Sequence, residues 1–551
     1  MEEAKSTESL SIAVIPPQPL LGEEVPTDPV EPVSENAQVL ISAFEEHEKE
    51  AHGEKKIRVN RVVAEVATWY ERIRNAMDYR ADEVILRAAI ERILKRRVLL
   101  LKKTGRSIAE PLLRELIWAR YFPDGAIPEA ILSRVARSID LYLALRKKLL
   151  EEKAMKEGEI DDWIFDLMSS DLEHILNSNK EDIIRNYMFQ VLRECVVIPD
   201  DTEETRDAQV FIAVCKSFAK DDVPFIRYHL FKQYFIDLNE DNIEEVAGSF
   251  TTYVKETKRE LNYKLKDRIF SYVRNQTPPF FILRDLLFLY KGDMEKLAHD
   301  KEACKKAVFQ ACESRYKAIA RKVQRAIIRS VIFILLTKTL FALSIEGTYE
   351  TLFYGKILWS SMLINIGIPP ILMIIVGLFI RTPSRDNSER IFERIDSILF
   401  DEKPKMGEPL TVRVSPEKTK PFLEFLFRFL WVIAFAVSFG LLYSVLSNLH
   451  FNIVNKGVFM FFFTIVSFLS YRIGQTAGEY SFQPRQGLMT PIVDFLFMPI
   501  IRVGRNLTEG IAQMNMLIFV LDFIIETPFK GAFAFFEQWF IFLHTKREEL
   551  G

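Results

Sequence analysis

The residue with the clearest chemical potential is a lysine inside an otherwise apolar stretch. Lys338 interrupts residues 330–344, which are otherwise apolar or carry hydroxyl groups, and it follows Arg329 by nine positions. Nine helical positions span about 13 Å, which would place the amine near the middle of a bilayer. A charge there costs at least roughly 2.5 kcal/mol, so it should face a polar partner or a wet cavity. The alternative is a helix that enters more deeply, with an amine that snorkels to the interface.

Polar side chains in other apolar stretches would suit Lys338 as partners. The candidates are Asn365, Asp494, Asp522 and Glu526. Together with Lys338 they would form an intramembrane polar site.

Three helix-breaking residues lie close to Asn365, namely Gly367, Pro369 and Pro370. Proline removes a backbone donor, so we expect a kink near the middle of residues 357–380. An unwound turn there would offer carbonyl groups to an ion, as broken helices of transporters do. The alternative is a bend that serves only packing, and the lack of a second broken segment in a matching position weakens the transporter interpretation.

Four apolar segments would position these residues. They cover residues 315–347, where a basic helix continues into the first span, and then 357–380, 422–449 and 457–473. Each has roughly the 20 apolar residues that a bilayer core of about 30 Å requires. The sequence therefore predicts a polytopic α-helical membrane domain of about four spans.

Basic residues near the ends of these segments predict their orientation. The turns before the first span carry Arg321, Lys322, Arg325 and Arg329, which favour the cytoplasmic side and candidate contacts with lipid headgroups or a partner. Residues 346–355 lack Lys and Arg and are expected outside, whereas the loop at 381–420 is basic and is expected inside. Both termini would then be cytoplasmic.

The C-terminal residues 489–551 predict amphipathic and aromatic helices that associate with the membrane. Asp494, Arg502 and Arg505 share one face of a helix from about residue 490, as expected of an interfacial helix. The aromatic stretch at 532–543 includes Trp539, a residue type that settles at headgroup level. We expect a re-entrant or surface hairpin, and a fifth and sixth span is the alternative.

The N-terminal half divides into a tail and a helical domain. Residues 1–56 are expected to form a disordered acidic tail and charged linker, since residues 1–55 carry 13 acidic and 3 basic residues. Apolar residues at helical spacing then predict a cytoplasmic helical domain at 57–314, including helices near 108–121 and 128–153. We expect a short strand at 410–414. The acidic residues Asp161, Asp162, Asp166, Asp171 and Glu173 predict a solvated helix face.

Several function classes find no support in the sequence. Nucleotide-binding loops and catalytic motifs of metalloproteases and α/β-hydrolases are missing. Cys195, Cys215, Cys304 and Cys312 form no CxxC pair and no His stands at ligand spacing, so we expect reduced thiols and no metal site. We also expect no cofactor and no nucleic acid.

These observations favour an all-α integral membrane protein without enzymatic activity. The first hypothesis is an anchor or scaffold whose cytoplasmic helical domain binds a protein partner. The alternative is an oligomeric channel or transporter that uses polar groups within the spans. The expected partners are the lipid bilayer, a cytoplasmic protein and further copies of the chain.

Overall fold

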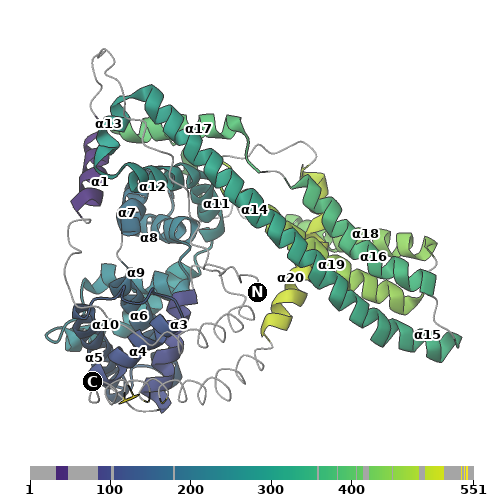
Figure 1. Ribbon diagram of the computed structural model, residues 1–551, viewed down its shortest axis with the longest axis horizontal. Helices are drawn as coiled ribbons and strands as arrows, with labels where there is room; N and C mark the ends of the chain where they lie inside the picture. The colour runs from purple at the N-terminus through teal and green to yellow at the C-terminus, as the bar shows by residue number, and fades with distance from the viewer. Residues whose placement is uncertain are drawn as a thin grey trace. The chain divides into compact units, whose positions relative to one another are not determined.

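The computed structural model describes residues 33–46, 85–100, 105–177, 180–355, 359–380, 382–404, 406–413, 421–449, 451–482 and 490–513, with a few single positions near the C-terminus. Helices dominate this part of the chain, which confirms the all-α prediction (Figure 1). The chain forms two compact units, divided between Arg274 and Asn275. We call them the N-terminal unit, with its main part at Ser42–Arg274, and the membrane unit, with its main parts at Asn275–Gly407 and Ser415–Gln513.

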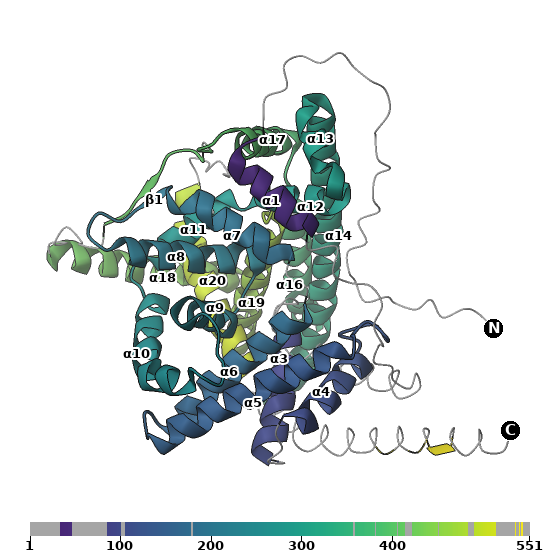
Figure 2. The same ribbon diagram turned by 90° about the vertical axis from the view of Figure 1, so that its left-hand side faces the viewer.

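The N-terminal unit is a bundle of helices around an apolar core (Figure 2). Its elements are α3 (Ile85–Lys95), η2 (Arg96–Leu100), α4 (Arg106–Trp118), α5 (Ala130–Glu151), α6 (Glu157–Leu176), α7 (Lys180–Arg193), β1 (Val196–Val197), α8 (Glu203–Val214), η3 (Cys215–Ala219), α9 (Val223–Phe235), α10 (Ile243–Leu261) and most of α11 (Lys266–Gln276). The helices expected near 108–121 and 128–153 are confirmed as α4 and α5, which pack against each other.

Helix α6 lies at the centre of this unit because its apolar residues meet α3, α5 and α9. The Trp163 ring packs edge-on against Tyr253 of α10, with 5.7 Å between ring centroids. The predicted strand at 410–414 is confirmed in part as β2 (Leu410–Thr411), which pairs in parallel with β1. The sequence had offered no partner for it.

The prediction of a solvated acidic face on α6 is wrong for two of its members. Asp166 and Glu173 are buried, and Asp166 binds the Arg227 guanidinium with 2.5 Å between Oδ2 and an Nη atom. Asp171 accepts a hydrogen bond from Tyr228, whereas Asp162 remains largely exposed. The pattern misled because acidic groups on a buried face are acceptable when cations and hydroxyl donors meet them.

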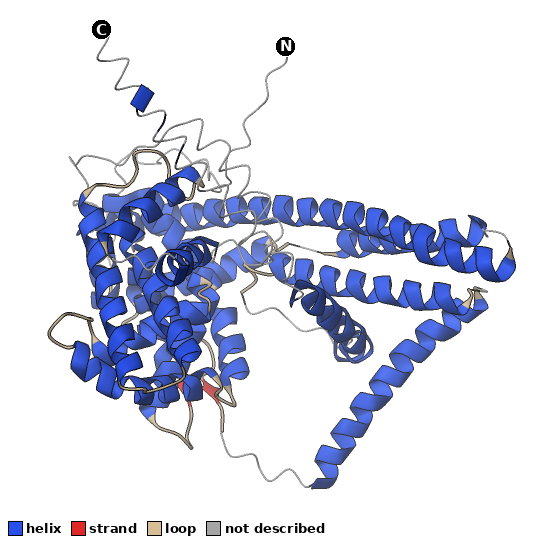
Figure 3. Cartoon of the chain, turned by 90° about the horizontal axis from the view of Figure 1, so that it is seen from below, coloured by secondary structure: helices blue, strands red, loops and turns tan. Residues whose placement is uncertain are grey.

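Within the described residues, the membrane unit has four helices that are long and apolar enough to cross a membrane. Figure 3 shows the long helices of the chain in blue. Its elements are α1 (Glu35–Glu46), α12 (Pro278–Tyr290), η4 (Lys291–Asp293), α13 (Met294–His299), α14 (Lys301–Phe341), η5 (Ala342–Glu346), α15 (Gly347–Tyr354), α16 (Trp359–Phe379), α17 (Arg385–Phe400), α18 (Pro421–Asn448), α19 (Ile453–Ala477) and α20 (Thr490–Gln513), with the end of α1 assigned to the other unit. The candidate spans are Lys301–Phe353, Met362–Phe379, Phe425–Asn448 and Ile453–Ala477.

Two details of the membrane unit differ from expectation. Residues 346–354 are helical rather than a loop, because Gly347 is accommodated within the helix. The helix ends only at Gly355, which has a φ of 69°. Helix α16 continues through Gly367, Pro369 and Pro370 as an uninterrupted helix, so the unwound turn considered as one alternative is not formed. Membrane helices tolerate proline because neighbouring groups satisfy the freed backbone carbonyls.

The acidic tail expected at 1–56 also contains a helix. In α1 the residues Ala37, Leu40, Ile41 and Phe44 are buried, and the Ser34 amide donates a hydrogen bond to the Leu399 carbonyl. The remaining residues of that tail lie outside the described part of the chain.

Candidate functional site

Lys338 is buried and paired inside the group of spanning helices. Its Nζ donates a hydrogen bond to Oε1 of Glu346 at 2.7 Å, and both side chains have 0 % exposure. Asn365 of α16 donates from Nδ2 to the other carboxylate oxygen of Glu346 at 2.8 Å. We call Lys338, Glu346 and Asn365 the polar triad. The triad fits the expected partnered lysine rather than a snorkelling amine.

A π-helical turn aligns the two charged residues. In a regular α-helix, residues eight positions apart point about 80° away from each other. The π turn η5 (Ala342–Glu346) holds one extra residue, so the spacing from Lys338 to Glu346 acts like seven positions and the offset falls to about 20°. Glu346 also reaches back toward Lys338, because helical side chains lean toward the N-terminus. The π turn therefore brings the Lys338 and Glu346 side chains onto one face of the helix, where they form the ion pair.

A second polar pair lies on the same face of this helix. Asn455 of α19 donates from Nδ2 to Oε1 of Glu350 at 3.3 Å, and both residues are buried. From the sequence, Glu346 and Glu350 were expected in a segment outside the membrane and Asn455 was not singled out, so all three were missed as site residues. The helix continues through Gly347, and neither this continuation nor the π turn could be foreseen.

Three spans surround the polar triad. Helices α14, α16 and α19 each pack against the other two (Figure 1). The Phe462 ring of α19 lies 5.2 Å from the Lys338 Nζ, where its π face stabilises the cation. Gly377 of α16 lies close to α14, since a Cβ added there would meet Ile327 at 2.8 Å. The charged pair thus lies where three helices pack together, beside an aromatic ring.

Two amide oxygens at this site have no hydrogen-bond partner. They are Oδ1 of Asn365 and Oδ1 of Asn455, both buried. A buried acceptor without a donor costs roughly 1–3 kcal/mol, which a cation, a water molecule or a protonated carboxyl group would recover. Carboxylate and amide oxygens are the ligands that hard cations prefer. The site can therefore hold a proton or a small cation at Glu346.

Of the other candidate residues for this site, the described ones lie on α16 without joining the polar triad. Gly367, Pro369 and Pro370 lie within α16, with both prolines buried. Asp494 belongs to α20, but its side chain lies outside the described part of the structure, as do Asp522 and Glu526.

The candidate headgroup residues are mostly exposed, as an interfacial role requires. Exposed cations on α14 are Arg321, Lys322, Arg325 and Arg329. On α20 the Arg502 guanidinium lies 5.6 Å from the Trp431 ring of α18, and Arg505 is exposed. Trp539 is 47 % exposed and stacks with Phe542 at 5.9 Å.

Helix α20 packs closely against two spans. Gly504 lies so near α19 that an added Cβ would stand 2.0 Å from the Thr464 carbonyl oxygen. The Ser438 hydroxyl of α18 donates a hydrogen bond to the Leu496 carbonyl at 2.7 Å. The predicted amphipathic helix is thus part of the helix packing of the membrane unit.

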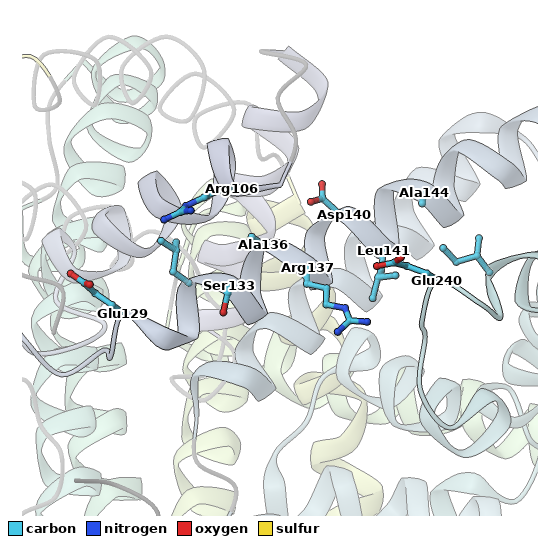
Figure 4. A pocket seen from close by; sticks show the side chains of 11 residues that line it. Arg106, Glu129, Ser133, Ala136, Arg137, Asp140, Leu141, Ala144 and Glu240 are labelled. Atoms are coloured by element: carbon cyan, nitrogen blue, oxygen red, sulfur yellow. The ribbon is translucent and has the colours of Figure 1, made fainter. Parts of the chain in front are cut away.

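The N-terminal unit has an open groove between α5 and its neighbours, of about 540 Å³. Figure 4 shows Arg106, Ser133, Arg137, Asp140 and Glu240 around it. Both charge signs are represented, and Leu132, Leu141 and Ile243 supply apolar contact area. The sequence analysis singled out none of these residues.

Comparison of the chain with protein families, with curated proteins and with solved structures gives no match.

Proposed function

We propose that the membrane unit moves a proton or a small monovalent cation across the membrane, with the polar triad as its binding site. The observation that supports this is the meeting of Lys338, Glu346 and Asn365 between three spans, beside unpartnered amide oxygens. Ionisable residues inside membranes commonly belong to ion pathways or proton relays. This is the channel or transporter hypothesis, with no catalytic step assigned to the chain.

The Lys338 ammonium group acts in this proposal as a built-in competitor for the transported cation. It occupies the position beside Glu346 that a cation would take. An arriving Na⁺ or K⁺ would bind the carboxylate and the Asn365 amide oxygen, and the displaced Lys338 ammonium group would release one proton to water in exchange. The net charge of the site then stays constant, which avoids the cost of an unpaired charge in the bilayer.

The proposed orientation places the N-terminal unit and the C-terminus in the cytoplasm. The basic residues on α14 before its apolar part support this, because Lys and Arg are enriched on the cytoplasmic side. Four candidate spans in the described part of the chain are few for a conduction path, so the working form in this proposal is a homo-oligomer in the lipid bilayer.

Flux into liposomes tests this function. Purified chain in phosphatidylethanolamine and phosphatidylglycerol vesicles should collapse an imposed gradient of H⁺, Na⁺ or K⁺ well above the rate of protein-free vesicles. A rate equal to that of protein-free vesicles for all three ions would remove the proposal.

The groove on the N-terminal unit favours a second function, that of a membrane anchor which recruits a cytoplasmic protein. Its mixed charges and apolar contacts suit an amphipathic helix of a partner. A photo-crosslinker at Ser133, within the groove, should then capture one defined partner, and Arg137→Glu should abolish that capture. The same crosslinker at Lys147, an exposed position on α5 that does not line the groove, is the control.

A further inference from the structure

Three side chains with metal-binding atoms converge in the N-terminal unit, far along the sequence from the polar triad. They are Cys215, Asp221 and His229, whose sulfur, oxygen and nitrogen ligand atoms all lie within 4.8 Å of one another. Cys215 is fully buried and His229 is nearly so. We propose that these residues bind a divalent transition-metal ion, with Zn²⁺ as the favoured species.

A local backbone irregularity creates this convergence. Cys215 begins the π turn η3, and Lys220 then adopts a left-handed conformation with φ of 61°. The Asp221 amide donates a hydrogen bond to the Cys215 carbonyl at 3.1 Å, which holds the ligand-bearing residues together. His229 joins them from α9. The sequence analysis expected no metal site because the spacing of these ligands matches no familiar pattern.

The environment of the ligands leaves coordination capacity unused. Oδ2 of Asp221 accepts no hydrogen bond, although its side chain is almost buried and lies 3.3 Å from the His229 Nε2. The rings of Phe211 and Phe225 flank the imidazole, with centroid distances of 6.0 and 5.4 Å. A metal ion beside these rings would satisfy the carboxylate.

The donor set selects the metal. Thiolate, imidazole and carboxylate together suit Zn²⁺ better than Ca²⁺ or Mg²⁺, which prefer oxygen ligands. Binding would form a metal–sulfur bond and release the Cys215 thiol proton to solvent. Because the thiol is buried, it is out of reach of a substrate, and a structural clamp between η3 and α9 is the role that fits.

The Arg185 guanidinium would compete with a metal ion for His229, so a substitution of Arg185 provides a control for metal binding. One of its Nη atoms lies 3.0 Å from the His229 Nε2, where it competes for the lone pair that a metal would use. The same nitrogen is 2.7 Å from Asp182, so the guanidinium keeps a partner if the metal takes the imidazole. Removing the positive charge should therefore strengthen metal binding.

Titration of the full chain with Co²⁺ in detergent, after treatment with a chelator, tests the site. The wild type should bind one Co²⁺ per chain with a thiolate-to-cobalt absorption band, and Zn²⁺ should displace it. Cys215→Ser should lose the band, whereas Cys304→Ser, a buried cysteine outside the cluster, should retain it. Asp221→Asn should weaken and Arg185→Met should strengthen Co²⁺ binding, each by on the order of 10-fold.

Two results would overturn the site. One is a wild type without the thiolate band. The other is a band that persists unchanged in Cys215→Ser. If Cys215→Ser fails to fold, as judged by circular dichroism, unchanged Co²⁺ affinity in both Asp221→Asn and Arg185→Met would reject the proposal equally.

Discussion

Lys338 donates a hydrogen bond to Glu346 across a π-helical turn, and neither side chain is exposed. The helix thus carries both members of an ion pair within one membrane span, and Asn365 adds a further contact from the neighbouring helix α16. Because both charged side chains belong to one helix, their charges neutralise each other without a charged group from a second helix.

Breaking the pair on one side should destabilise the protein more than removing it altogether. Lys338→Met leaves the Glu346 charge without a cation and should cost about 3–5 kcal/mol of unfolding free energy. The double variant Lys338→Met and Glu346→Gln leaves no charge, so most of that loss should be recovered. Denaturation of four proteins in the same micelles measures both effects: the wild type, Lys338→Met, Glu346→Gln and the double variant. A double variant as unstable as the sum of its single variants would contradict a coupled pair.

The π turn makes an unusual prediction about deletions. Removing Leu343, an exposed residue of η5, should convert the π turn into a regular α-helix in which Lys338 and Glu346 still share a face. The expected result is a melting temperature close to that of the wild type. Removing the exposed Leu336 from the regular part of α14 leaves the spacing from Lys338 to Glu346 unchanged. It should instead rotate both residues by about 100° relative to the preceding part of the helix, which turns the pair away from Asn365 and lowers the melting temperature. Equal damage from both deletions would argue against this role of the turn.

Close packing of α20 on α19 should depend on a glycine. Gly504→Ala forces a methyl group against the Thr464 carbonyl and should destabilise the protein by roughly 1–3 kcal/mol. Gly440→Ala on α18 is the matched control, since an added Cβ there meets no neighbouring atom. It should be neutral or stabilising by up to about 1 kcal/mol, because glycine is unfavourable inside helices. Melting temperatures that fall equally in both variants would contradict the packing argument.

Glu173 should make the N-terminal unit less stable at alkaline pH. Burial raises the pKa of this carboxyl group to about 8, assisted by Asp221 and Asp222 and opposed by Arg87. The folded chain then holds the proton more tightly than the unfolded chain, whose carboxyl group has an ordinary pKa near 4.5. Stability should therefore fall as pH rises from about 4.5 to about 8, by at most about 1.4 kcal/mol per pH unit.

Glu173→Gln should flatten this pH dependence, because the amide stays neutral throughout. Asp162→Asn changes an exposed acid on the same helix and should leave the slope unaltered. The measurement is the melting temperature of each variant between pH 5 and pH 8. An identical slope in Glu173→Gln and the wild type would assign the effect to another group.

The sequence predicted four apolar segments and two members of the polar triad, Lys338 and Asn365, but not the arrangement of the site. Apolar length and helical period suffice for α16, α18 and α19, and polar residues within an apolar segment are visible without coordinates. Glu346 was missed as the partner of Lys338 because acidic residues near the end of an apolar stretch resemble a loop outside the membrane. A π turn changes the direction in which every later side chain of the helix points, and no residue type at 342–346 predicts such a turn.

Contacts between residues that are distant in sequence could not be predicted either. The meeting of Asn365 with Glu346, and that of Cys215 with His229, depend on helix packing and on local backbone irregularities. Gly367, Pro369 and Pro370 illustrate the opposite failure, in which a strong local signal for a break was overridden by the surrounding helices.

Cation flux through the double variant measures whether the polar triad is the transport site. Lys338→Met combined with Glu346→Gln removes the charges of the polar triad, while Thr337→Val alters a neighbouring residue whose hydroxyl bonds carbonyl groups of its own helix. In liposomes with equal amounts of folded protein, the double variant should lose at least about 90 % of the wild-type cation flux. Thr337→Val should retain that flux. Wild-type flux in the double variant would contradict the assignment of the triad as the transport site.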